Sequence, residues 1–238
     1  MPSLGGQVAV VTGASRGIGR AVALMLASEG AHVIAVSRAI AGLESLDDAI
    51  KALGVKDGAT LVPLDLKDHV ALDRLGASIH ARWGVLDILV GNAAVLGPIT
   101  PVEQISPQKF QELLDVNLTA NWRLIRALAP LLLASKNGGR AVFVSSGAAR
   151  SAKPFWGGYS MSKAALESIV KIWAAENEKT QLRVNLFNPG ATRTEMRASA
   201  MPGEDPMTLP APETVAEAIL PLLLSDCAVT GGAISFQR

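Results

Sequence analysis

The sequence is poor in several reactive side chains: its 238 residues include one cysteine, one tyrosine and three histidines. A single cysteine, Cys227, excludes a disulfide within the chain and favours a cytoplasmic protein. Because Cys227 has no histidine near it in the sequence, we interpret it as a structural residue. No metal site is predicted.

The sequence also lacks a strong net charge and a long hydrophobic run. Its 22 basic and 21 acidic residues are scattered and leave a formal charge of +1, so neither nucleic acid nor an acidic membrane surface is an expected partner. No apolar run is long enough to span a bilayer: the nearest candidate, "LIRALAPLLLAS", is short and is interrupted by Arg126 and Pro130. The first residues, "MPSLGGQ", lack the basic and apolar regions of a signal peptide, and we expect none.

What the sequence does contain is an alternation of short apolar runs with longer amphipathic stretches. The runs are continuous, as is typical of parallel strands that are buried on both faces. Seven such strands are predicted: Gln7–Thr12, Ala31–Ser37, Ala59–Asp65, Leu86–Asn92, Gly139–Ser146, Gln181–Asn188 and Ala233–Gln237.

The intervening stretches have helical spacing. Ser106 and Pro107 have the residue types of an N-cap and a first helical position, and they predict one long helix from Pro107 to Ser135. Another is predicted from Gly157 to Glu178. The alternation indicates an α/β fold: a single Rossmann-type doubly wound domain over residues 1–238, with a parallel sheet of about seven strands and helices on both faces.

One connection, at about residues 191–212, is rich in methionine and proline and is longer than a simple link. Loops of this length are often functional, so we expect a substrate loop here. Its Met196, Met201 and Met207, together with Leu96, Phe155 and Trp156, are candidates for an apolar substrate pocket. Ordinary packing is the equal alternative for these side chains.

A glycine-rich turn, "TGASRGIGR", follows the first predicted strand directly. Gly13, Gly17 and Gly19 allow the backbone to approach a pyrophosphate, and the next helix presents its N-terminal N–H groups to it. The motif alone is weak, and a purely structural turn is the alternative. The strand–turn–helix context favours nucleotide binding.

The end of the second strand, "VSR", bears on the choice of cofactor. Ser37 stands where NAD-specific folds place an acidic residue, and Arg38 follows it. Arg38 and Arg16, which lies in the glycine turn, suit a 2′-phosphate because the guanidinium group matches phosphate geometry. We therefore predict NADP(H) as the preferred cofactor and leave NAD(H) open. The alternative for Arg38 is a solvated residue at a helix start.

The only tyrosine, Tyr159, precedes Lys163 by four positions, so both fall on one face of the predicted helix. Ser146 lies thirteen positions before Tyr159, at the end of the fifth strand, where ligands of open α/β sheets bind. Taken alone, Tyr159 would be interpreted as a packing aromatic. Ser145 is interpreted as structural.

Several motifs together resemble the short-chain dehydrogenase/reductase family over Val8 to about Gly232. They are "TGASRGIG", "LDL" at 64–66, "NA" at 92–93, Asn117 within "DVNL", "SS" at 145–146, "YSMSK" and "NPGATRT". The segment "TRTEMRASAMPGEDPMTLPAP" looks like a YciK-like bacterial oxidoreductase branch of that family, which lacks a well-defined substrate.

The resemblance implies hydride transfer between NADP(H) and a small carbonyl or alcohol substrate. Tyr159 resembles the general acid/base, and Ser146 the residue that binds the substrate oxygen. Lys163 resembles the residue that holds the nicotinamide ribose and lowers the pKa of the tyrosine, and Asn117 the one that positions a relay water through its helix. A free phenol has a pKa of about 10, so neighbouring positive charge is needed to make it a base at neutral pH.

The same resemblance assigns further cofactor contacts. Asp65 matches the residue that contacts the adenine amino group, although it also suits a cap of the next turn. Pro189 and Gly190 match the segment along the nicotinamide, with a simple strand-ending turn as the alternative. Thr192 and Thr194 match contacts to the carboxamide and the phosphates. The remaining predicted contacts are Ser15, Ile18, Leu66, Asn92 and Ala93, together with Tyr159 and Lys163.

The chain departs from the family pattern in two places. "GNAA" replaces "NNAG", and Ala94 would be strained if its position required a positive φ. The chain stops soon after the last predicted strand, so a homodimer built on the two long helices is a rival to the usual homotetramer. Gly157 and Gly158, before the tyrosine, suggest room for a cofactor or substrate.

Two other functions fit parts of this pattern. A non-catalytic NADP-binding sensor or interaction protein on the same fold would show degenerate catalytic residues, which this sequence does not. A sugar-nucleotide epimerase or dehydratase also uses Tyr-x-x-x-Lys, but it normally needs a larger C-terminal substrate domain than 238 residues allow.

Overall fold

The computed structural model describes residues 3–55 and 58–237, so positions 1–2, 56–57 and 238 of the predicted domain lie outside the described residues. Seven parallel strands form one sheet in the order β3-β2-β1-β4-β5-β6-β7. The predicted α/β fold is confirmed, with most strands slightly shorter than expected. The strands are β1 (Val8–Thr12), β2 (His32–Ser37), β3 (Thr60–Pro63), β4 (Ile88–Gly91), β5 (Arg140–Val144), β6 (Arg183–Asn188) and β7 (Ala233–Ser235).

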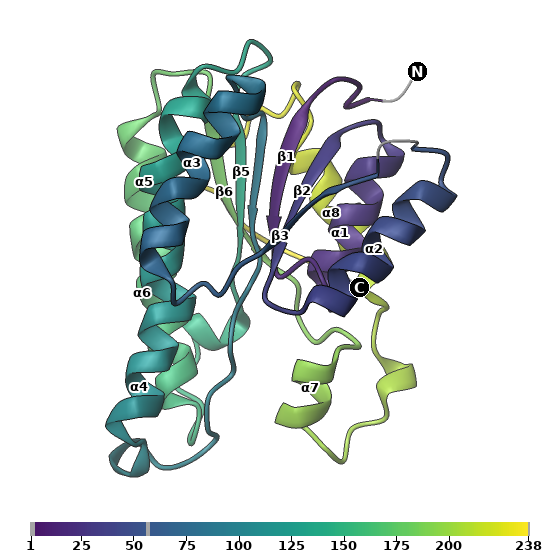
Figure 1. Cartoon of the computed structure of the whole chain (residues 1–238). Coiled ribbons are helices and arrows are strands. Elements are labelled where there is room, and N and C mark those ends of the chain that lie inside the picture. The colour runs from purple at the N-terminus through teal and green to yellow at the C-terminus, as the bar shows by residue number, and fades with distance from the viewer. Residues whose placement is uncertain (1–2, 56–57, 238) are drawn as a thin grey trace.

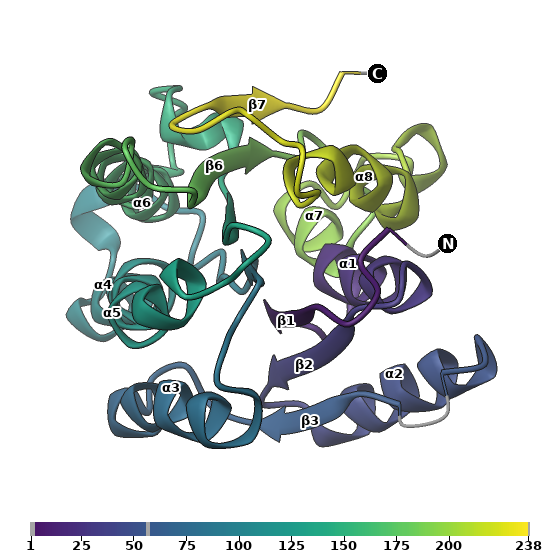
Figure 2. The same ribbon diagram turned by 90° about the horizontal axis from the view of Figure 1, so that it is seen from above.

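Helices cover both faces of the sheet and form three layers, as the view from above shows (Figure 2). One face carries α1 (Gly17–Ser28), α2 (Ile40–Ala52) and α8 (Pro212–Ile219), and the other carries α3 (His69–Trp83), α5 (Ala120–Leu133) and α6 (Gly157–Glu176). The shorter helical elements are α4 (Pro107–Leu114), α7 (Glu195–Ala200), η1 (Val102–Gln104), η2 (Asp115–Thr119), η3 (Gly147–Ala149), η4 (Pro206–Thr208) and η5 (Leu220–Leu222).

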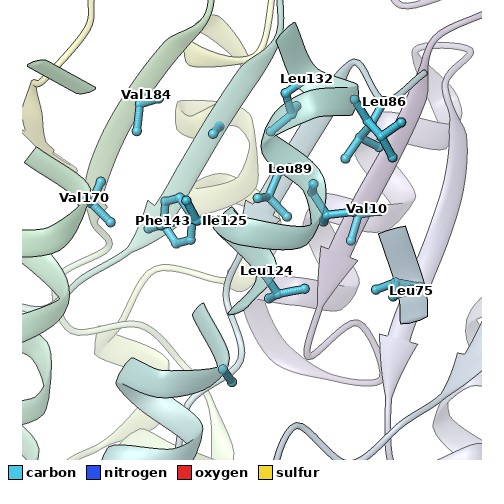
Figure 3. Packing of buried hydrophobic residues seen from close by; sticks show 14 of the residues in the cluster. Val10, Leu75, Leu86, Leu89, Leu124, Ile125, Leu132, Phe143, Val170 and Val184 are labelled. Atoms are coloured by element: carbon cyan, nitrogen blue, oxygen red, sulfur yellow. The ribbon is translucent and has the colours of Figure 1, made fainter. Parts of the chain in front are cut away.

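The core lies on both sides of the sheet because successive strand residues point to opposite faces. Val10 belongs to the cluster beneath α3, α5 and α6, whereas Val11 belongs to the cluster beneath α1, α2 and α8. Figure 3 shows Leu124 of α5 and Phe143 of β5 among the side chains of the first cluster. Burial on two faces explains why the strands appear in the sequence as continuous apolar runs.

The strand order changes direction at β1. From β1 the chain proceeds outward to β2 and β3, and then returns to β4 on the other side of β1. Such a switch point places a binding crevice beyond the carboxyl ends of the strands. In Figure 1 the segment that contains α7 lies below the sheet, beyond this end of it.

The predicted helix from Pro107 to Ser135 is not one regular α-helix, which corrects the sequence-based prediction. Its start is as expected, because the Ser106 side chain accepts a hydrogen bond from the Lys109 N–H (3.3 Å) and Pro107 opens the helix. A π-helical turn, Asp115–Thr119, then separates α4 from α5. Insertions of this kind are frequent at functional sites.

The loop expected at about residues 191–212 has structure of its own. Arg197 and Glu204 form a two-pronged ion pair, with Nε–Oε2 at 2.5 Å and Nη2–Oε1 at 2.7 Å. The Arg193 N–H donates to the carbonyl oxygen of Pro210 (3.0 Å), which joins the two ends of the loop. Within residues 3–55 and 58–237, no helix is both long and apolar enough to cross a membrane.

Candidate functional site

A cavity of about 730 Å³ lies at the carboxyl ends of the strands, around the switch point. Nearly all of the predicted site residues line it. These are Gly13, Ser15, Arg16, Gly17, Ile18, Ser37, Arg38, Asp65, Leu66, Asn92, Ala93, Ser146, Tyr159, Lys163, Pro189, Gly190, Thr192 and Thr194. The structure therefore brings together residues from the ends of β1 to β5, from the start of α6 and from the loop after β6. Gly19 and Asn117 lie outside this lining.

The glycine turn forms one wall of the cavity. Gly13 and Gly17 have φ of +67° and +56°, which glycine adopts without the strain that a side chain would cause. A Cβ at Gly19 would lie 2.3 Å from the carbonyl oxygen of Gly13, so this glycine allows α1 to approach the turn closely. No side chain caps the start of α1, so its first N–H groups can serve an anion.

Asn92 supports this wall from below. Its Nδ2 donates to the carbonyl oxygen of Thr12 (2.9 Å), and its backbone N–H donates to Thr12 Oγ1 (3.0 Å). These bonds tie the end of β4 to the glycine turn. The "GNAA" departure causes no strain, because Phe155 is the only non-glycine residue with positive φ among the described residues. A Cβ at Gly91 would lie 2.4 Å from the Phe143 ring, which explains the glycine there.

The arginines expected at a 2′-phosphate differ in their surroundings. Arg38 is exposed at the rim of the cavity, next to Ser37, whose hydroxyl donates to Ser15 Oγ (2.9 Å). Arg16 instead forms an ion pair with Glu195, which begins α7 and also lines the cavity. Both side chains of this pair are 72% exposed, so the pair is a weak one that an incoming phosphate can displace.

Asp65 lines the cavity, but its side chain already has a local partner. Its Oδ1 accepts a hydrogen bond from the backbone N–H of Lys67 (3.0 Å). This is the turn-capping role that the sequence left open. The second carboxylate oxygen is not engaged by this bond, so the cap and the predicted adenine contact are compatible.

The opposite wall carries Ser146, Tyr159 and Lys163. Tyr159 lies in the first turn of α6 and Lys163 one turn later, where only 2% of its surface is exposed. Lys163 Nζ donates to the carbonyl oxygen of Val144 (2.7 Å), at the end of β5. Burial lowers the pKa of Lys163 to about 8. The ammonium group is thus fixed beneath the cavity floor.

The environment of Tyr159 differs from the sequence-based expectation. Burial raises the pKa of its phenol above the ordinary value of 10, and a hydrogen bond with Ser146 acts in the opposite direction. Lys163 Nζ is hydrogen-bonded to the Val144 carbonyl, and the lowering of the Tyr159 pKa by Lys163 stays a prediction. The protein's own groups therefore keep Tyr159 protonated at neutral pH.

Asn117 lies in the π-helical turn and is fully buried behind the cavity. Its Oδ1 accepts from the Val95 N–H (2.8 Å), and its Nδ2 donates to the Val95 carbonyl (2.9 Å) and to Ser162 Oγ (2.9 Å). Its own carbonyl accepts from Asn121 Nδ2 (2.9 Å). The Asn117 side chain thus fastens the loop after β4 to α6.

The candidate substrate side of the cavity is smaller than the sequence suggested. Leu96, Trp156 and Met196 line it, whereas Phe155, Met201 and Met207 do not. Trp156 packs edge-on to Tyr159, with ring centroids 6.2 Å apart. Residue type alone cannot predict which of these side chains line the cavity, because the direction in which a loop side chain points depends on the fold.

The room expected at Gly157 and Gly158 serves packing instead. A Cβ at Gly157 would lie 2.5 Å from Val102 Cγ2, and one at Gly158 would lie 2.7 Å from Leu113 Cδ1. Neither glycine lines the cavity. They allow α6 to begin close to η1 and α4, which corrects the prediction of space for a ligand.

Sequence reasoning missed charged residues that the loop after β6 brings to the cavity. Arg193, Glu195 and Arg197 line it together with the threonines that were predicted. These three residues lie within the predicted substrate loop at about residues 191–212, and this position could have indicated that they approach the cavity. A second cavity of about 610 Å³, at the other end of the sheet near His32 and Trp83, contains none of the predicted site residues.

Comparison with known proteins agrees with this geometry. The family model described as short chain dehydrogenase matches residues 7–205. The chain is 37% identical to the oxidoreductase YciK of Escherichia coli K12, over 94% of this chain and 88% of the relative. It is also 37% identical to an NAD-dependent oxidoreductase of Mycobacterium tuberculosis, over 82% of this chain and 74% of that protein.

The solved structures agree as well. A short chain dehydrogenase from Escherichia coli CFT073, complexed with NADPH, superimposes with a TM-score of 0.94 at 36% identity, covering 100% of this chain and 99% of that one. This solved relative matches the present chain over its whole length, so the likeness includes the sheet, the glycine turn and the wall that carries Ser146, Tyr159 and Lys163. The chain belongs to the short-chain dehydrogenase/reductase family of oxidoreductases.

Proposed function

We propose that the protein is an NADP(H)-dependent oxidoreductase that interconverts a carbonyl and an alcohol on a small molecule, with Tyr159 as general acid/base. The observation that carries this proposal is the cavity itself: the glycine turn forms one wall, and Ser146, Tyr159 and Lys163 form the opposite one. The single cysteine favours a cytoplasmic setting for this activity.

The residues present fit a dinucleotide. The uncapped start of α1 suits the pyrophosphate, and Arg38 with Arg16 suits a 2′-phosphate. The ammonium of Lys163, fixed beneath the cavity, suits ribose hydroxyl groups. NADPH in the Escherichia coli CFT073 relative supports NADP(H), and the NAD-dependent name of the Mycobacterium tuberculosis relative keeps NAD(H) as the alternative. When bound, the cofactor supplies the hydride.

The chain's own residues then manage the proton. Tyr159 is protonated at neutral pH because burial raises its pKa, so it can donate a proton to the oxygen of a carbonyl that is being reduced. Ser146 adjoins Tyr159 and can donate a hydrogen bond to the same oxygen, which stabilises its developing negative charge. In the oxidative direction, a nearby positive charge is needed to make Tyr159 a proton acceptor.

The test follows NADPH absorbance with a panel of carbonyl compounds, for the wild type and for Tyr159→Phe. We expect turnover of at least one compound by the wild type, and a loss of about 100- to 10,000-fold in kcat for the variant with NADPH affinity retained. Equal turnover by both proteins would contradict the role of Tyr159 as general acid/base. NADPH binding by the wild type without turnover of any compound would favour the alternative function, a non-catalytic NADP-binding sensor or interaction protein.

A further inference from the structure

Helix α6 contacts the end of β5 through three successive turns. Tyr159, Lys163 and Glu167 are spaced by four residues and therefore share one face of the helix. Lys163 binds the Val144 carbonyl (2.7 Å), and Ser145 Oγ donates to Glu167 Oε1 (2.7 Å). Tyr159, one turn earlier, faces the next strand-end residue, Ser146, whose hydroxyl lies near enough to lower the pKa of the phenol.

Glu167 also holds the chain beyond Ser146. Arg150 donates from Nε to Glu167 Oε2 (3.2 Å) and from Nη2 to Oε1 (3.1 Å), the two-pronged arrangement that fixes geometry as well as charge. Ser145 precedes the turn of residues 146–149 and Arg150 follows it. The Glu167 carboxylate is therefore hydrogen-bonded to the residues on both sides of the turn that contains Ser146.

The Glu167 carboxylate is suited to this role by its burial and its bonds. Only 5% of its surface is exposed. Burial raises its pKa, but hydrogen bonds from Arg150, Ser145 and Lys171 outweigh this effect and lower the pKa below the ordinary value. The group is therefore ionised at neutral pH. A buried carboxylate with these partners holds its position, because breaking any bond leaves charge exposed to a poorly solvated interior.

We propose that Glu167 is a positioning residue, which fastens the turn of residues 146–149 to α6 and so sets Ser146 against Tyr159. The inference rests on the proposed function, in which these two hydroxyl groups act on the same substrate oxygen. Small displacements matter at such a site, because misplacing a reacting group by about 1 Å can lower a rate by about 100-fold.

The test uses variants that release the turn. Glu167→Asp keeps the charge but is one methylene shorter, so it cannot reach both Ser145 and Arg150. Ser145→Ala removes the contact at one end. Lys171→Gln is the matched control, because Lys171 Nζ contacts the same Glu167 carboxylate (3.2 Å) from within α6 and holds no part of the turn.

We expect Glu167→Asp and Ser145→Ala to lower kcat about tenfold or more, with KM for NADPH within about twofold of the wild type. Lys171→Gln should leave both constants unchanged. A kcat for Ser145→Ala equal to that of Lys171→Gln would overturn the proposal, and Ser145→Ala decides the question if Glu167→Asp fails to fold.

A second readout does not need turnover. Tyr159 is the only tyrosine, so its ultraviolet titration reports one phenol. Because the Ser146 hydrogen bond lowers the pKa of Tyr159, releasing the turn should raise that pKa in Ser145→Ala and leave it unchanged in Lys171→Gln. An unchanged titration in both variants contradicts positioning by Glu167. Absence of turnover in the wild type would refute the proposed function alone.

Discussion

Lys163 is the residue whose burial has the clearest consequence for stability. Its pKa is about 8 in the folded protein, against 10.5 for an ordinary lysine, so between these values the unfolded chain binds more protons than the folded one. The free energy of unfolding therefore rises with pH across this window, by about 1.4 kcal/mol per unit at most. Tyr159, with a pKa raised above 10, acts in the opposite direction, but only above pH 10.

Lys163→Met should remove this dependence. We expect the stability of the wild type relative to Lys163→Met to increase by about 2 kcal/mol between pH 7.5 and 9.5, as measured by urea denaturation. Below pH 7.5, both folded and unfolded wild-type chains carry the proton, and the difference should be flat. Parallel pH profiles for the two proteins would show that Lys163 is not buried with a lowered pKa.

Arg38 carries the expected cofactor preference, since Arg16 is shared with Glu195. Arg38→Ala should weaken NADPH binding about 10- to 100-fold, as loss of a charged hydrogen bond implies, and leave NADH binding unchanged. Fluorescence titration with both cofactors measures this. Arg74→Ala is the control, because Arg74 is exposed on α3 and does not line the cavity. Equal weakening of NADH and NADPH binding would exclude contact with a 2′-phosphate.

At the scale of elements, the π-helical turn is the feature that local sequence could not predict. Ser106 and Pro107 fixed the start of the helix through their own backbone preferences. The turn around Asn117 instead places the Asn117 side chain where it forms hydrogen bonds with the backbone N–H and carbonyl of Val95, which is remote in sequence. Hydrogen bonds between the turn around Asn117 and the loop after β4 can be recognised only when the fold has brought the two segments together.

Asn117→Ala should therefore destabilise the protein by about 1–3 kcal/mol, because it removes two hydrogen bonds to the half-buried backbone of Val95 and one to the buried hydroxyl of Ser162. Urea denaturation measures this loss. Asn137→Ala, at an exposed position after α5, should change stability by less than about 0.5 kcal/mol. Similar stabilities for both variants would contradict a bracing role for Asn117.

In the loops, too, features that depend on local sequence motifs could be predicted, whereas contacts between residues far apart in the sequence could not. The threonines of the loop after β6 were placed at the cavity by motif, and they line it. Arg16 and Glu195 are 179 positions apart, and nothing local to either predicts their pairing. Likewise, the crowding of Gly157 by Val102 depends on how η1 packs on α6, so the glycine was mistaken for ligand space.

For the whole molecule, the sheet and the place of the cavity could be predicted because continuous apolar runs and a β-α alternation constrain the topology strongly. The oligomeric state could not be predicted, because the packing of a single chain does not by itself require a partner subunit. Trp122 of α5 and Ile172 of α6 are nevertheless large apolar side chains exposed on the two long helices. We propose that these helices form the interface of a homodimer or homotetramer.

Sedimentation at several concentrations tests this assembly. The wild type should sediment as a dimer or tetramer, and Ile172→Glu should shift it towards a smaller species because the charge would be buried in the interface. Ile40→Glu, an equally exposed position on α2, should leave the mass unchanged. A monomeric wild type would contradict the proposed interface.

The central claim is that Tyr159 exchanges a proton in step with hydride transfer, and its own titration tests this most directly. As the only tyrosine, it can be followed by ultraviolet absorbance with and without saturating NADP⁺. The phenol should titrate above pH 10 in the protein alone, and bound NADP⁺ should lower its pKa through the positive nicotinamide. A pKa that NADP⁺ leaves unchanged would contradict the assignment of Tyr159 as the acid/base.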